Sequence, residues 1–147
     1  MTNIEERIHS SFDQQRVMKL LNARLLTIQP GEVQIELPYS PEITQQNGYV
    51  HAGIITTVVD SACGYAAYSL MPPDASVLSV EFKLNFMNPA KGESFIASGR
   101  VIKSGRTLTV CSGELHAIEN GEQILVALMQ ATMIAVRRGE TRNESRN

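Results

Sequence analysis

The sequence predicts an α+β fold in which a long central helix lies against a curved antiparallel sheet, with a further helix at the N-terminus. Two observations carry this prediction. Residues 53–70 are apolar at helical spacing and are followed by Pro72-Pro73, which ends a helix. The segments on both sides of this helix alternate with the two-residue period of strands and are separated by short turn signals, which favours antiparallel pairing.

The remaining elements follow from the same patterns. Residues 4–22 predict a helix, although its apolar positions are irregularly spaced. Residues 23–29 and 32–37 predict a hairpin around Pro30-Gly31, and 38–46 a loop. Four strands are expected after the central helix, as a consecutive antiparallel meander, at 78–86, 93–103, 106–117 and 122–136.

The strand at 78–86 has the clearest alternation in the chain. Because side chains on a strand point to opposite faces in turn, its apolar and polar residues should separate. We expect one face to carry Leu78, Val80, Phe82, Leu84 and Phe86, and the other to carry Ser79, Glu81, Lys83 and Asn85.

Composition limits the class of protein. A chain of 147 residues suits one domain, expected at 1–136, followed by a polar tail at 137–147. The net charge of −2 shows no basic surplus for nucleic acid or an anionic membrane. Residues 1–16 have no apolar signal-peptide core, and no unbroken apolar run reaches the roughly 20 residues of a membrane span. We expect a cytoplasmic protein without nucleic-acid or membrane partners.

Asp60 is the most unusual residue, because it is the one acid inside the apolar central helix. Carboxylates are rarely buried without compensation. In one interpretation Asp60 faces solvent or bonds a neighbouring threonine. In the other it lies in a dry cleft, where it acts as a general base or as a nucleophile.

The segment 47–53 leads into this helix and supplies a second candidate group. The amides of Ala52 and Gly53 at the helix start could stabilise an oxyanion, although Gly53 could equally be only a turn residue. His51 is either a base or a residue that shapes the turn by bonding backbone. Asp60 lies seven residues beyond Gly53, roughly 10 Å along the axis. One carbonyl cannot easily touch both, so the simplest geometry takes the two groups from different subunits of a two-fold dimer.

Other chemistry has no matching motif. The chain contains no G-x-S-x-G elbow, no P-loop, no dinucleotide fingerprint and no metal-ligand spacing. Cys63 and Cys111 lie in apolar segments and are expected to be free core thiols, including Cys63 one turn after Asp60. Acid–base hydrolysis would need no cofactor and no metal.

With these motifs the chain resembles the hotdog-fold acyl-CoA thioesterases of the PaaI-like, or phenylacetic acid degradation, type. The resemblance runs from about residue 21 to residue 136 and centres on Gly48-x-x-His51-Ala52-Gly53 with Asp60 seven residues on. The segment 86–92 and the Gly105-Arg106 hairpin support it.

The resemblance implies hydrolysis of an acyl- or aroyl-CoA to a free acid and coenzyme A. Asp60 would be the catalytic carboxylate, the Ala52 or Gly53 amide of another subunit would polarise the carbonyl, and Ser79 would assist the water. It also implies a homodimer or a dimer of dimers with active sites at the subunit interface. The alternatives are a non-catalytic acyl-CoA binding domain and a dehydratase or hydratase of the same fold.

Two departures from the family pattern concern the substrate. Ala52 stands where the family often has glycine, and Gln45 replaces the usual asparagine six residues before His51. Gln45 still offers an amide to the thioester or to water. Further substrate contacts are expected from Asn47, Gly48, Ser79, Lys83 and Arg106, the two cations being candidates for coenzyme A phosphates. The identity of the acyl group stays open.

Overall fold

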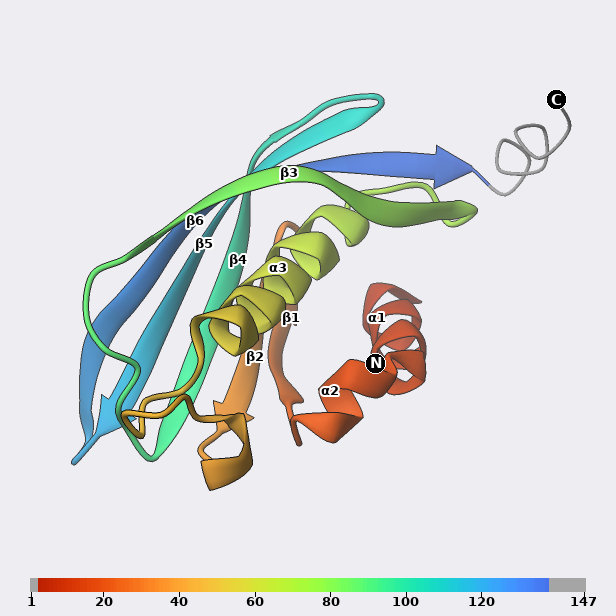
Figure 1. Ribbon diagram of the computed structural model, residues 1–147. Coiled ribbons are helices and arrows are strands. Elements are labelled where there is room, and N and C mark those ends of the chain that lie inside the picture. The colour runs from red at the N-terminus through yellow and green to blue at the C-terminus, as the bar shows by residue number, and fades with distance from the viewer. Residues whose placement is uncertain (1–2, 138–147) are drawn as a thin grey trace, which may run out of the picture.

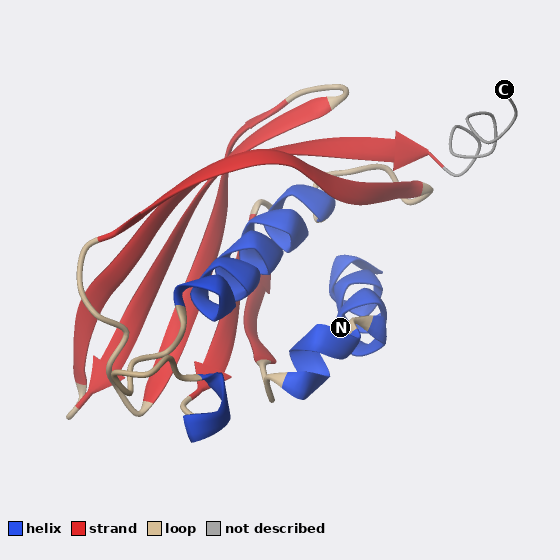
Figure 2. Ribbon diagram, in the orientation of Figure 1, coloured by secondary structure: helices blue, strands red, loops and turns tan. Residues whose placement is uncertain are grey.

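A curved six-stranded sheet wraps around one long helix, α3 (Ala52–Tyr68), in the computed structural model, which describes residues 3–137 (Figure 1). The N-terminal helices α1 (Asn3–Gln14) and α2 (Arg16–Leu20) lie beside α3 (Figure 2). The strands are β1 (Arg24–Gln29), β2 (Glu32–Pro38), β3 (Ala75–Phe86), β4 (Ser94–Ser104), β5 (Leu108–Glu119) and β6 (Glu122–Arg137). The α+β fold with a central helix is thereby confirmed. A short 3₁₀ helix, η1 (Pro41–Ile43), interrupts the predicted loop, and residues 138–147 of the predicted tail lie outside the described residues.

The predicted N-terminal helix is two helices, not one. The backbone at Gln15 is extended (φ −79°, ψ 96°), which separates α1 from α2. The buried positions explain the break: Ile8 and Phe12 of α1 are one turn apart, but Met18 of α2 would point away from them on a continuous helix. Reorienting the chain at Gln15 allows all three side chains to reach the core.

The predicted meander is correct for β4, β5 and β6 but wrong for β3. The strand order is β1-β2-β4-β5-β6-β3, with every neighbouring pair antiparallel. β3 therefore lies at an edge of the sheet, paired with β6, instead of next to β4. Its other edge has no partner strand within residues 3–137.

A β-bulge in β3 also overturns the strict alternation expected there. The register to β6 shifts between Ser79 and Glu81. Residues directly opposite each other in an antiparallel pair point to the same face, and Ser79 is opposite Met133, which is fully buried on the helix side. Ser79 thus shares the inner face with Phe82, whereas Leu78 lies on the outer face. A strand without the bulge would have turned Ser79 outward.

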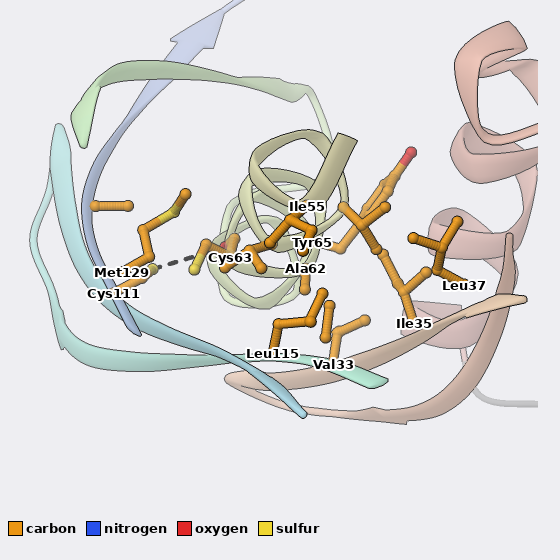
Figure 3. Close-up of a cluster of buried hydrophobic side chains, with 14 of the residues drawn as sticks. Val33, Ile35, Leu37, Ile55, Ala62, Cys63, Tyr65, Cys111, Leu115 and Met129 are labelled. Carbon is orange, nitrogen blue, oxygen red and sulfur yellow. Dashed lines mark hydrogen bonds between the residues drawn. The ribbon is translucent and has the colours of Figure 1, made fainter. Parts of the chain in front are cut away.

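The core lies between α3 and the concave face of the sheet (Figure 3). Two glycines directly opposite each other, Gly99 of β4 and Gly113 of β5, lie under the helix. A Cβ at Gly99 would lie 2.3 Å from the Ala62 carbonyl, and one at Gly113 would lie 2.7 Å from Cys63 Sγ and Val59 Cγ1. The helix backbone therefore packs directly on the sheet at a point where no side chain fits.

We predict that Gly99→Ala destabilises the fold by about 3 kcal/mol, because the added methyl group must displace helix backbone. Gly113→Ala should cost less, since its obstacles are side chains. Gly64→Ala is the control, because a Cβ there meets no atom within 4 Å. Urea unfolding gives the three free energies; equal losses at Gly99 and Gly64 would contradict this account of the packing.

Candidate active site

Asp60 projects from the middle of α3 and is half-buried. The hydroxyl of Ser79 on β3 donates a hydrogen bond of 2.6 Å to Asp60 Oδ1. The bulge makes this bond possible, because it turns Ser79 to the helix side. The partner of the acid is thus a strand serine and not a neighbouring threonine. Asp60 Oδ2 accepts no hydrogen bond from the part of the chain that the structure describes.

A hollow of about 170 Å³ opens in front of Asp60. Its far wall is formed by α1 and the residue that follows it: Ser61 donates to Gln15 Oε1 at 3.2 Å, and the hydroxyls of Ser11 and Tyr65 are 3.3 Å apart. Figure 3 shows the Tyr65 ring leaving the core toward the N-terminal helices. Sequence reasoning missed this wall, because Gln15 lies after the end of α1 and no pattern in the sequence places it beside Ser61.

His51 caps the start of α3. Its Nδ1 accepts a 2.8 Å hydrogen bond from the Gly53 amide, which places the proton of the neutral ring on Nε2. This geometry fits the turn-shaping interpretation of His51. It also occupies the Gly53 amide. The amide of Ala52, the first residue of the helix, has no acceptor among residues 3–137 and remains available as a donor.

A larger cavity of about 590 Å³ lies at this helix start. Gln45, His51 and Ala52 line it, and the segment 86–90 forms the opposite side. The side-chain oxygen of Gln45 accepts the Asn47 amide, so that it stabilises the turn. Asn47 and Gly48 are exposed in that turn, where Gly48 has a φ of +83°, and neither residue lines the cavity.

The structure thus divides the predicted catalytic residues between two hollows of one chain, except for Gly53, which lines neither. Asp60 and Ser79 line the smaller hollow, and Gln45, His51 and Ala52 line the larger one. No residue lines both. This division agrees with the separation of the acid and the helix start along α3.

The two predicted cations lie elsewhere. Lys83 is opposite Gln130 and lines a hollow on the outer face of the sheet, whereas Asp60 lies on the inner side. Arg106 is in the β4–β5 hairpin and lines a polar hollow of about 310 Å³ together with Thr107 and Arg137. Neither Arg106 nor Arg137 pairs with an acid of the described residues.

The two cysteines belong to the core. Cys63 and Cys111 are fully buried free thiols, and Cys111 Sγ lies 3.6 Å from the Cys63 carbonyl oxygen (Figure 3). Burial raises the pKa of Cys111 to about 11, and burial together with Cys111 and Asp60 raises the pKa of Cys63 still further. Because the thiolate is the nucleophilic form, burial and a raised pKa are typical of a structural core thiol.

Within residues 3–137, no three His, Cys, Asp or Glu side chains are grouped so that they could hold a metal ion. None of the described helices is long and apolar enough to cross a membrane.

Known proteins resemble this chain in both sequence and fold. Residues 47–124 match the family model described as the thioesterase superfamily. A thioesterase family protein of Silicibacter pomeroyi is 49% identical, with 92% of this chain and 99% of that chain covered and a TM-score of 0.91. Human acyl-coenzyme A thioesterase 13 is 32% identical over 101 residues, which are 68% of this chain and 71% of that protein. The Escherichia coli PaaI protein shares the fold, with a TM-score of 0.81, 16% identity and coverage of 90% and 93%.

The helix wrapped by an antiparallel sheet and these matches define a hotdog-fold hydrolase of thioesters. The chain belongs to the thioesterase superfamily. The resemblance expected from the 48–53 motif and Asp60 is confirmed at this level.

Proposed function

We propose that the protein hydrolyses an acyl- or aroyl-CoA to the free acid and coenzyme A, in active sites that two subunits build together. The hydrogen bond between Ser79 and Asp60 is the observation on which this proposal rests. It holds a carboxylate at the edge of a hollow, with one oxygen bonded and the other open to a ligand. The similarity to a named acyl-CoA thioesterase supports the choice of substrate.

In the proposed reaction Asp60 is the general base. Its free oxygen takes a proton from a water molecule, the water oxygen bonds to the thioester carbonyl carbon, and the carbon–sulfur bond then breaks. The proton passes to the leaving thiolate, so that a free acid and a thiol are produced. Ser79 keeps the carboxylate oriented, because its hydroxyl donates to Oδ1. Direct attack by the carboxylate would instead expel the thiolate and form a mixed anhydride between Asp60 and the acyl group, which water would then hydrolyse.

The Ala52 amide is the proposed oxyanion donor. It lies at the positive end of the α3 dipole and is unbonded, whereas the Gly53 amide is held by His51. Gln45 and the Nε2–H of His51 border the same cavity and could bind the thioester or a water. We place the oxygen of the thioester carbonyl in this cavity of one subunit and the carbonyl carbon near Asp60 of the partner subunit.

The open edge of β3 indicates how two chains could unite these groups. β3 has 12 residues and exposes apolar side chains, including Val80, Phe82 and Phe86. Long apolar edges of this kind favour pairing with another strand. Two-fold antiparallel pairing of β3 with its copy puts the Ser79 end of one strand beside the Phe86 end of the other. The Asp60 hollow of one subunit would then adjoin the large cavity of its partner.

The proposal also includes a binding site for the phosphates of coenzyme A and a cellular compartment. We propose that Arg106, with Arg137 beside it, binds the phosphates of coenzyme A, and we assign no such role to Lys83 on the outer face. The two free thiols fit a reducing compartment, so we also propose a cytoplasmic enzyme.

Asp60→Asn and Asp60→Ala should reduce kcat by roughly 10²- to 10⁴-fold, because they remove the general base. The fold and the assembly should stay unchanged, as measured by circular dichroism and light scattering. Hydrolysis of a panel of acyl-CoA thioesters is followed by the release of coenzyme A with a thiol reagent. Glu122→Gln, an exposed acid at the start of β6, is the matched control.

Full turnover by Asp60→Ala would contradict the assignment of the base. Whether Asp60 acts as a general base or as a nucleophile is tested separately with the wild-type enzyme in ¹⁸O-labelled water. If Asp60 is a base, the label enters the product acid alone. Label in the peptide that carries Asp60 would show that water opened an anhydride at the aspartate carbonyl, which would establish Asp60 as the nucleophile.

A shared site predicts rescue between two inactive chains. Ala52→Pro removes the proposed donor, and proline is well tolerated at the first position of a helix. The residue before it, His51, already has the extended backbone (φ −59°, ψ 138°) that a following proline requires. An Asp60→Ala chain and an Ala52→Pro chain should each be inactive alone. Their purified heterodimer should regain about half of the wild-type kcat, since one of its two sites contains both groups.

No rescue in a heterodimer verified by mass spectrometry would mean that the acid and the amide act from the same chain. Mixed Asp60→Ala chains carrying two different tags provide the control for the exchange procedure.

Arg106→Ala should raise KM for an acyl-CoA about fivefold, the equivalent of about 1 kcal/mol for an exposed contact. The KM for the corresponding acyl-pantetheine, which lacks the nucleotide phosphates, should not change. Arg100→Ala is the control, because Arg100 is an exposed cation of β4 paired with Glu32 at 3.6 Å. Equal effects on both substrates would contradict phosphate binding by Arg106.

A further inference from the structure

Gly64 is a glycine that the fold of the single chain does not require. It lies inside α3, its backbone is helical, and a Cβ built on it meets no atom within 4 Å. Gly99 and Gly113 differ, because the close approach of α3 leaves no room for a side chain at either position. Glycine inside a helix is destabilising relative to alanine, since it loses more backbone freedom on folding. The packing of one chain therefore does not explain why position 64 is glycine and not alanine.

The position of Gly64 connects it with the proposed catalytic acid. It follows Asp60 by four residues, so the two lie one above the other on the same face of the helix. Both line the 170 Å³ hollow. The methyl group that alanine would carry at this position would thus project beside the carboxylate, into the space that a bound substrate would use.

The size of this hollow restricts what can occupy it. A cavity of about 150 Å³ is known to hold one benzene molecule, which makes a volume of about 170 Å³ suitable for a group of that size. The hydrogen bonds from Ser61 to Gln15 and between Ser11 and Tyr65 hold the far wall in place. The long pantetheine arm of coenzyme A cannot fit there, whereas the cavity of about 590 Å³ at the helix start could accommodate part of it.

We infer that Gly64 is a specificity-determining residue, which leaves space beside Asp60 for a compact acyl group of up to about one six-membered ring. This inference rests on the proposed function and adds the substrate class to it. The N-terminal helix α1 limits the acyl group at its far end, and Gly64 sets the width of the pocket beside the thioester. A long alkyl chain does not fit this pocket.

The test narrows the pocket by substitutions at Gly64 alone. Gly64→Ala and Gly64→Leu are assayed with acetyl-, hexanoyl-, benzoyl- and palmitoyl-CoA by release of coenzyme A. We expect kcat/KM for hexanoyl- and benzoyl-CoA to fall by about tenfold or more in Gly64→Ala. Gly64→Leu should lower it further, and the loss of kcat/KM for acetyl-CoA should be several-fold smaller than the loss for hexanoyl- or benzoyl-CoA. Wild type should prefer hexanoyl- or benzoyl-CoA to palmitoyl-CoA.

Stability and assembly separate this role from a structural one. Gly64→Ala should raise the melting temperature by about 2–4 °C, because alanine favours the helix. Ser10→Ala, an exposed position of α1 outside the hollow, should change stability without changing acyl preference. The dimer mass should stay unchanged in light scattering.

Four results would overturn the inference. An equal loss of kcat/KM for acetyl- and benzoyl-CoA, or a preference of wild type for palmitoyl-CoA, would overturn it while leaving the proposed function intact. Loss of the dimer in Gly64→Ala would show that the space is filled by a partner subunit instead. Absence of hydrolysis of all four thioesters by wild type would overturn the proposed function, and the inference with it.

Discussion

The contact between α3 and two opposed glycines of the sheet is the constraint on which the rest of the structure depends. At Gly99 the backbone of the helix lies directly on the backbone of β4. The distance between α3 and the sheet is therefore set by backbone atoms, which cannot move independently of their elements. Well-packed interiors transmit such constraints, because they contain little free space. Asp60 lies two residues before Ala62, the residue in contact with Gly99, so this contact fixes the helix backbone from which the carboxylate projects.

On the opposite face of α3 the glycine belongs to the helix and not to its neighbours. Where α3 meets the sheet, its neighbours are glycines. Where it faces the hollow, the glycine is in the helix itself, at Gly64, and a Cβ there would meet no atom of residues 3–137 within 4 Å. The bulge in β3 adds the serine that holds Asp60. Close packing on one side thus supports an open, polar hollow on the other, which is the arrangement that a site with a fixed carboxylate requires.

Local patterns were sufficient for most elements and for the candidate acid. The apolar spacing predicted α3 within two residues at each end, and the lone acid in it identified Asp60. The position of β3 next to β6 could not be predicted, because strand order depends on contacts between residues distant in sequence. The alternation of residues 78–86 contains no signal for a bulge, so the inward direction of Ser79 was also missed. The break in the N-terminal helix at Gln15 follows from tertiary packing, because Met18 reaches the core only when the chain turns there.

The exposed edge of β3 connects the proposed assembly with the proposed chemistry. An exposed edge strand of 12 residues with several apolar side chains is a hazard for a protein that remains monomeric, since any other edge can pair with it. Pairing with its own copy would remove this hazard and bury Val80 and Phe82. The same two-fold operation would bring Asp60 toward the helix start of the partner, a distance that one rigid helix cannot close. In the proposed dimer, association is therefore a condition for catalysis, because a single chain keeps its acid and its free amide in separate hollows.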